Sequence, residues 1–151
     1  MLDEKDKLIL EVLQKDSRLS TYNIAKKTAI PQTTILNRMK KLKDIGIIKA
    51  YTIDLDWKKL DKNTKAIIFT KVNKAAENSV GEIEKRISKL PHVLNVKRLM
   101  GKNDFMVEVV CKDIDELNNF LIKKIRVLPE IADTETVVVL EEWEENHFLT
   151  L

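Results

Sequence analysis

The sequence predicts an α+β protein in two parts, a helical N-terminal third followed by alternating strands and helices. Apolar residues recur at helical spacing up to residue 46, and β-prone and helical stretches alternate after residue 64. The charge also differs between the parts. Residues 1–50 contain 11 Lys and Arg against 6 Asp and Glu, whereas residues 61–151 contain 14 against 16. A polyanion is therefore the expected partner of the N-terminal third only.

The N-terminal third predicts three helices followed by a short strand. Asp3 and Ser20 are suitable N-caps, and Pro31 is tolerated at a helix start. Gly46 is suited to ending the third helix, and residues 47–53 are β-prone, as in the wing of a winged helix-turn-helix. The apolar stripes are Leu8, Ile9, Val12 and Leu13 in the first helix, Ile24 and Ala25 in the second, and Ile35, Met39 and Leu42 in the third.

The short turn over residues 28–30 lets the third helix lie across the second. The outer face of the third helix is then free to enter the major groove of DNA. Gln and Asn side chains pair with adenine, Leu36 suits a thymine methyl group, and basic side chains suit phosphates. The alternative is a solvated basic helix on an ordinary three-helix bundle. The predicted DNA-binding residues are Thr21, Tyr22, Gln32, Thr33, Thr34, Leu36, Asn37, Arg38, Lys40 and Lys41.

The rest of the chain contains a weak repeat, in which Leu90-Pro91 and Leu128-Pro129 each separate a helical stretch from a β-prone one. A capping box at Ser79 and a cap at Asp113 begin the two helices. Two βαβ units predict a ferredoxin-like βαββαβ domain with both helices on one face. The expected strands are 65–73, 93–100, 105–111 and 131–140, and the expected domains are residues 1–53 and 64–151, joined by a hinge over 54–63.

The predicted strands are apolar on both faces. Ile67 and Phe69 point to one side of the sheet, Ala66 and Ile68 point to the other, and residues 137–140 are apolar throughout. Helices can cover only one face, and an uncovered apolar face is more often an interface than a solvent-exposed surface. We therefore expect a homodimer that forms through the sheet.

Other classes of function have little support in the sequence. Cys111 is the single cysteine, and His92 and His147 have no partner at metal-ligand spacing, so neither a disulfide nor a metal site is expected. No cofactor loop or catalytic constellation is present, so we expect no enzyme. An RNA-recognition motif would need more strand aromatics than Phe105. The absence of long apolar runs and of a signal segment predicts a cytoplasmic protein.

The order of several short motifs resembles the Lrp/AsnC family of leucine-responsive and asparagine-type transcription regulators, over essentially the whole chain. Each motif is modest, but their order and spacing together are specific. The carriers are Leu2-Asp3-x-x-Asp6-x-x-Ile9-Leu10, Asp16-Ser17-Arg18-Leu19-Ser20, Ile24-Ala25-Lys26-Lys27, Thr34-Ile35-x-x-Arg38-Met39-Lys40-x-Leu42, Gly46-Ile47-Ile48-Lys49-Ala50-Tyr51, Leu90-Pro91-x-Val93, Gly101-x-x-Asp104 and Leu128-Pro129-x-Ile131-x-x-Thr134-x-Thr136.

The resemblance implies a sequence-specific DNA-binding transcription regulator that dimerises through its second domain and often assembles further, to octamers. It also implies an amino-acid effector that binds at a subunit interface near the turn over residues 101–104. Without the resemblance, that turn would be interpreted simply as a β-hairpin. The alternative function is an effector-independent architectural DNA-binding protein. The implied effector-binding residues are Gly101, Asn103, Asp104, Thr134 and Thr136.

Two positions depart from the family's pattern. Ala29 stands where a Gly is common in the turn, and Pro31 stands where a Ser commonly caps the third helix. Because proline has no side-chain oxygen, the third helix is expected to begin differently from its relatives.

Overall fold

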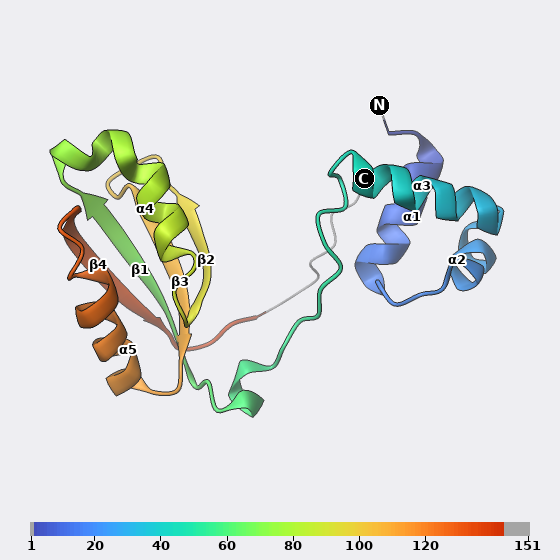
Figure 1. Ribbon diagram of the computed structural model, residues 1–151. Coiled ribbons are helices and arrows are strands. Elements are labelled where there is room, and N and C mark those ends of the chain that lie inside the picture. Colours follow the sequence, from blue (N-terminus) through green and yellow to red (C-terminus); the bar gives the residue numbers. More distant parts are fainter. Residues whose placement is uncertain (1, 144–151) are drawn as a thin grey trace. The chain divides into compact units, whose positions relative to one another are not determined.

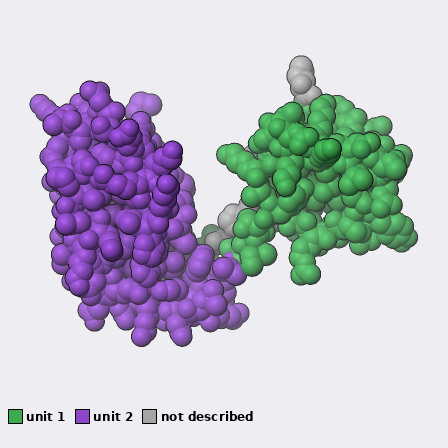
Figure 2. Space-filling view, viewed as in Figure 1, with its two compact units in different colours: residues 1–54, 143–151 green, residues 55–142 purple. Residues whose placement is uncertain are grey.

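The computed structural model describes residues 2–143, and Figure 1 shows its helices and strands. The chain divides into two compact units, which Figure 2 colours separately. Of the described residues, 2–54 and Trp143 belong to the first unit, and residues 55–142 belong to the second. The expected hinge over residues 54–63 thus lies largely within the second unit, where Trp57–Leu60 form a 3-10 turn.

The first unit consists of three helices around a small apolar core. These are α1 (Glu4–Lys15), α2 (Thr21–Thr28) and α3 (Gln32–Asp44), as predicted. Asp3 caps α1 through a reciprocal capping box with Asp6, and the Ser20 hydroxyl accepts a hydrogen bond from the Asn23 amide at the start of α2. The buried residues of this core are Ile9, Leu13, Ile24, Ile30, Ile35, Leu42 and Ile48.

The turn between α2 and α3 contains both departures noted in the sequence. Ala29 adopts a left-handed conformation with φ 56°, and its amide donates a hydrogen bond to the Ala25 carbonyl. Pro31 is the N-cap of α3 and makes no side-chain hydrogen bond, so the helix begins at Gln32 without the usual oxygen cap. A left-handed conformation strains residues that carry a Cβ, which is why glycine is common at such positions.

Replacing Ala29 by Gly should therefore stabilise the first unit. Relief of the left-handed strain outweighs the added flexibility of the unfolded chain, for an expected gain of about 0.5–1 kcal/mol and a rise of a few degrees in melting temperature. Calorimetry of the full-length protein measures this change. Ala25→Gly is the matched control, because the same exchange inside α2 should cost about 1 kcal/mol. Destabilisation by both substitutions would contradict the explanation.

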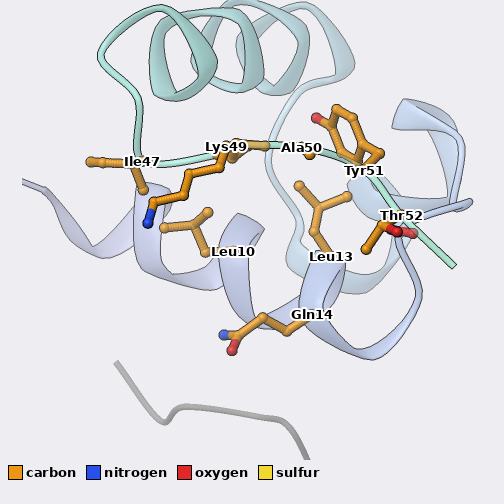
Figure 3. Close-up of a pocket in the computed structure, with 10 residues that line it drawn as sticks. Leu10, Leu13, Gln14, Ile47, Lys49, Ala50, Tyr51 and Thr52 are labelled. Atoms are coloured by element: carbon orange, nitrogen blue, oxygen red, sulfur yellow. The ribbon is translucent and has the colours of Figure 1, made fainter. Parts of the chain in front are cut away.

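Residues 47–53, where the wing strand is predicted, have no strand assignment. Ile48 is buried in the helical core, and the neighbouring residues run as an extended segment along α1. Figure 3 shows this segment facing Leu10 and Leu13 of α1 across an apolar pocket. A strand needs a hydrogen-bonded neighbour, and all four strands in the described part of the chain lie in the second unit. Within the described residues, the first unit therefore offers this segment no strand to pair with.

The second unit confirms the ferredoxin-like fold. Its antiparallel sheet has the strand order β2-β3-β1-β4, which is the order that two interlocked βαβ units produce. The strands and helices, in chain order, are β1 (Thr64–Val72), a 3-10 turn (Lys74–Ser79), α4 (Val80–Ile87), β2 (Val93–Arg98), β3 (Phe105–Cys111), α5 (Ile114–Phe120), a π-helical turn (Leu121–Ile125) and β4 (Ile131–Val139).

Both helices pack on the same face of the sheet, as Figure 1 shows. Ile83 and Ile87 of α4, with Leu117 and Phe120 of α5, share one core with the inward residues of β1 and β3. The expected capping box at Ser79 is wrong, because Ser79 makes no side-chain cap. The preceding 3-10 turn runs directly into α4 and replaces it.

The predicted cap at the start of α5, Asp113, is formed. The Asp113 carboxylate accepts a hydrogen bond from the Glu116 amide, as a capping residue should. In a standard capping box the Glu116 carboxylate would accept the amide hydrogen of the N-cap residue, Asp113. Here it accepts the amide hydrogen of the preceding residue, Lys112, at 2.6 Å. Across residues 2–143, no helix is both long and apolar enough to cross a bilayer.

Candidate DNA-binding surface and effector turn

The outer face of α3 is exposed, as a recognition helix requires. Leu36 is 60% exposed, so its side chain is accessible to a partner. Ile35 and Leu42 are buried on the opposite face and hold the helix on the core. The predicted DNA-binding residues that are exposed are Tyr22, Gln32, Thr33, Leu36, Asn37, Lys40 and Lys41, while Thr21 and Thr34 are half-buried.

Gln32 and Thr21 connect the starts of α2 and α3. The Gln32 side-chain amide donates a hydrogen bond to the Thr21 hydroxyl over 2.8 Å. This bond joins the first residues of the two helices, at a position where Pro31 provides no cap. It orients Gln32 at the end of α3 that enters the major groove in helix-turn-helix proteins.

Arg38 has a structural partner rather than a free guanidinium group. Its Nη1 lies 2.6 Å from the Asp3 carboxylate and 2.8 Å from Oδ1 of Asp6, so it joins α3 to the N-terminus of α1. The Asp6 side chain is only 4% exposed. The hydrogen bond from Arg38 lowers the pKa of Asp3 from 3.8 to about 2, and those from Asp3 and Asp6 raise the pKa of Arg38. Arg38 is half-buried, and its role as a DNA-binding residue stays a prediction.

The turn over residues 101–104 closes one end of the sheet. The Asp104 carboxylate accepts the amide hydrogen of Val72 at 2.8 Å, and the Asp104 amide donates to the Thr70 carbonyl at 2.9 Å. Asp104 therefore holds the last residues of β1 against the start of β3. Gly101 is exposed, and Asn103 is half-buried beside Asp104.

Thr134 and Thr136 lie on β4, at the same end of the sheet as this turn. Thr70 of β1 pairs with Phe105 on one side and with Thr134 on the other, so the turn and Thr134 flank the same residue. The Thr134 hydroxyl accepts a hydrogen bond from Nε of Arg126 at 2.8 Å. Within the described part of the chain, the buried hydroxyl oxygens of Thr70 and Thr136 have no hydrogen-bond partner.

The sheet face opposite the helices carries both apolar and charged side chains. Strand register places Ile67, Phe69, Met106, Val137 and Val139 on this open face. Lys65 and Glu108 pair within it, with Nζ and Oε1 2.7 Å apart and both side chains less than one-fifth exposed. Burial lowers the pKa of Lys65, but the hydrogen bonds and charges of Glu108 and Glu142 have the larger combined effect and raise this pKa above its ordinary value.

One cluster was missed by sequence reasoning. His92, Cys111 and Glu116 are brought together by three different elements, and their donor atoms all lie within 4.8 Å of one another. His92 has no partner at ligand spacing along the sequence, but the fold brings it close to Cys111 and Glu116. Only spatial proximity reveals the cluster, because the three residues are separated by 19 and 5 positions in the sequence. Cys111 is fully buried, and burial raises the pKa of its thiol to about 11.

A helix-turn-helix with an exposed α3, followed by a ferredoxin-like unit with an open sheet face, defines a class of protein. It is a DNA-binding regulator that carries a separate ligand-binding domain. Family models agree with this description, because the winged helix-turn-helix DNA-binding model matches residues 2–49 and the Lrp/AsnC ligand binding domain matches residues 65–147.

The chain belongs to the Lrp/AsnC family of transcription regulators. It is 34% identical over 140 residues to the transcriptional regulator AzlB of Bacillus subtilis, an alignment that covers 93% of this chain and 89% of AzlB. Among solved structures, AsnC of E. coli is similar with a TM-score of 0.86 and 28% identity, over 98% of each chain. A transcriptional regulator from Neisseria meningitidis, solved as a complex with L-Met, has a TM-score of 0.90 and 26% identity, over 99% of this chain and 96% of that one.

Proposed function

We propose that this regulator reads a specific DNA sequence with α3 and responds to an amino acid bound at a subunit interface. The observation that carries the DNA-reading part is the outer face of α3, where Leu36 and Asn37 are exposed while the opposite face is buried. Asn pairs with adenine through two hydrogen bonds, and Leu36 suits a thymine methyl group. Exposed Lys40 and Lys41 suit the flanking phosphates.

The effector part rests on the end of the sheet around Asp104. A carboxylate can accept several hydrogen bonds, and Val72 uses one of the sites on Asp104, so capacity for an ammonium group is available. Nearby, the buried hydroxyls of Thr70 and Thr136 lack partners among the described residues, and buried polar groups generally need one. The L-Met bound to the Neisseria meningitidis protein is consistent with an amino acid as the ligand class.

The dimer interface in this proposal is the open sheet face. The effector would bind at a different interface, between dimers near the turn over residues 101–104, when they assemble further to an octamer. An apolar face that helices leave uncovered favours a partner, and a second copy of the chain supplies the same surface. A symmetric dimer would present two α3 helices to successive major grooves, about 34–36 Å apart.

The effector proposal is tested with Asp104→Asn in the full-length protein. Asn keeps an oxygen for the Val72 amide and removes only the charge. Titration calorimetry against the twenty amino acids should find one or more that bind the parent protein. We expect Asp104→Asn to weaken that binding roughly tenfold or more, the usual value of a charged hydrogen bond. DNA affinity without the amino acid should be unchanged.

Asp115→Asn provides the matched control, because this exposed aspartate on α5 should leave the ligand affinity as it is. Binding that is equally strong in both variants would exclude Asp104 as the ammonium partner. If no amino acid binds and DNA affinity never changes, the protein acts as an effector-independent architectural DNA-binding protein.

A charged residue on the open face should separate the subunits. Phe69→Lys places an ammonium group on the open face beside Glu135, its cross-strand partner, so a partner subunit would have to bury both charged groups. Sedimentation velocity should show a shift from dimer to monomer, at unchanged helix content. Glu82→Lys, on an exposed position of α4, is the control that should stay dimeric. A Phe69→Lys protein that remains dimeric would place the interface elsewhere.

A further inference from the structure

We propose that the second unit contains a binding site for a borderline-soft divalent metal ion such as Zn²⁺, formed by His92, Cys111 and Glu116. The inference is independent of the proposed effector function. One ligand atom of each residue lies within 4.8 Å of the other two, and Nδ1 of His92 is 3.8 Å from Oε2 of Glu116. Atoms at such separations can all lie within about 3 Å of a common point, so small side-chain adjustments reach Zn–ligand distances of about 2.0–2.3 Å.

The three donors come from separate parts of the fold. Cys111 ends β3 and is fully buried, while Glu116 lies in the first turn of α5. His92 precedes β2 and adopts a left-handed conformation with φ 71°. Such backbone strain in a residue other than glycine persists only where the surrounding structure enforces it, and it concentrates at functional sites.

Two contacts fix the strained histidine. The Val110 amide donates a hydrogen bond to the His92 carbonyl at 2.9 Å, which ties this turn to β3 next to Cys111. The imidazole ring meets the Phe120 ring edge-on, with centroids 5.9 Å apart. The turn and the ring contact together direct the imidazole toward the donors on β3 and α5.

The donor types select the ion. Imidazole, thiolate and carboxylate are the ligands that Zn²⁺ uses, whereas Mg²⁺ and Ca²⁺ prefer oxygen ligands throughout. Three protein ligands leave a fourth position for water or for a donor from another molecule. The site is therefore suited to a transition metal.

A positive charge already lies beside the carboxylate. Oε2 of Glu116 is 3.3 Å from Nζ of Lys62 and also accepts the Lys112 amide hydrogen. The backbone hydrogen bond orients the carboxylate in the way that outer-shell contacts orient metal ligands. The Lys62 side chain is one-third exposed and flexible, so it can leave when a metal ion supplies the charge.

The metal site and the effector turn are at opposite ends of the sheet. Cys111 pairs with Thr64 at the start of β1, whereas the effector turn meets β1 at Thr70. The Asn63 amide donates to the Lys112 carbonyl, so the segment that leads into β1 is attached to the residue after Cys111. A metal ion here would act on the chain just before β1.

The test uses untagged, full-length protein after chelator treatment, with Co²⁺ absorption spectroscopy and Zn²⁺ calorimetry. Each variant preserves local structure: His92→Asn retains a residue that tolerates positive φ, Glu116→Gln still accepts the Lys112 amide, and Cys111→Ala removes only the sulfur. We expect one metal ion per chain, with a thiolate-to-cobalt charge-transfer band that Cys111→Ala abolishes. His92→Asn and Glu116→Gln should raise the dissociation constant at least about tenfold.

The control is Glu82→Gln, the same exchange as Glu116→Gln at an exposed position of α4, which should leave the binding unchanged. Circular dichroism verifies that each variant is folded, and any one folded variant suffices for the comparison. Absence of the charge-transfer band in the parent protein would overturn the proposal. Equal Zn²⁺ affinity in the parent and in a folded ligand variant would overturn it as well.

Discussion

Replacing Arg38 by Met should strongly destabilise the first unit. Met keeps the apolar part of the side chain, but the substitution removes the guanidinium that bonds Asp3 and Asp6. The Asp6 carboxylate, which is almost fully buried, would then keep only the hydrogen bond from the Asp3 amide. Leaving a buried carboxylate without its charged partner costs about 3 kcal/mol or more. Calorimetry should show the loss in the transition of the first unit, with the second unit as an internal reference.

The pH dependence provides a second measurement of the same contact. Arg38 lowers the folded-state pKa of Asp3 to about 2, below its ordinary value of 3.8. The stability gained from this pair is therefore fully present above pH 3.8 and is lost as the pH falls toward 2. The Arg38→Met protein should lack this acid-dependent part of the folding stability. Lys40→Met, on the exposed face of the same helix, should retain both the stability and its pH profile.

Removing the Asn37 side chain should relax DNA specificity rather than abolish binding. A bidentate contact between asparagine and adenine provides about 1–3 kcal/mol of discrimination at one base pair. We expect Asn37→Ala to lose that amount on the preferred site and to bind unrelated DNA as before. Competition binding with a library randomised at single positions measures the effect. An unchanged preference at every position would show that Asn37 does not contact a base.

Lys41→Ala should have a different signature. A lysine that contacts a phosphate adds affinity for every sequence, so its loss weakens all sites alike and reduces the slope of log K against log salt by about 1. Fluorescence anisotropy across a range of salt concentrations measures this slope. Lys15→Ala, an equal change of charge at the exposed end of α1, is the matched control and should leave the slope unchanged.

Most of the fold could be predicted because its signals are local. Helix periodicity, the caps at Asp3 and Ser20, and the repeated Leu-Pro pair all depend on neighbours within a few residues. The wing was different, because a strand exists only if another strand pairs with it, and composition alone cannot supply that partner. The same limit applies to Ser79, where an unforeseen 3-10 turn occupies the place of the cap.

The candidate sites depended more on contacts between distant residues. The exposed face of α3 follows from helical periodicity and was predictable. The pairing of Arg38 with Asp3 crosses 35 positions, and the approach of His92 to Cys111 depends on the whole sheet. Contacts of this kind follow from the tertiary fold. They could be inferred only after the strand register was known.

The division into two compact units has a consequence for regulation. Helix α3 belongs to one unit and the turn over residues 101–104 to the other. A ligand at the turn would therefore change DNA binding from a different unit than the one that binds DNA. Its influence must be a coupling free energy, carried by the connecting chain or by the arrangement of subunits. Coupling of this kind is reciprocal. An amino acid that changes the affinity for an operator by some factor must itself be bound more tightly or more weakly, by that same factor, when the operator is occupied.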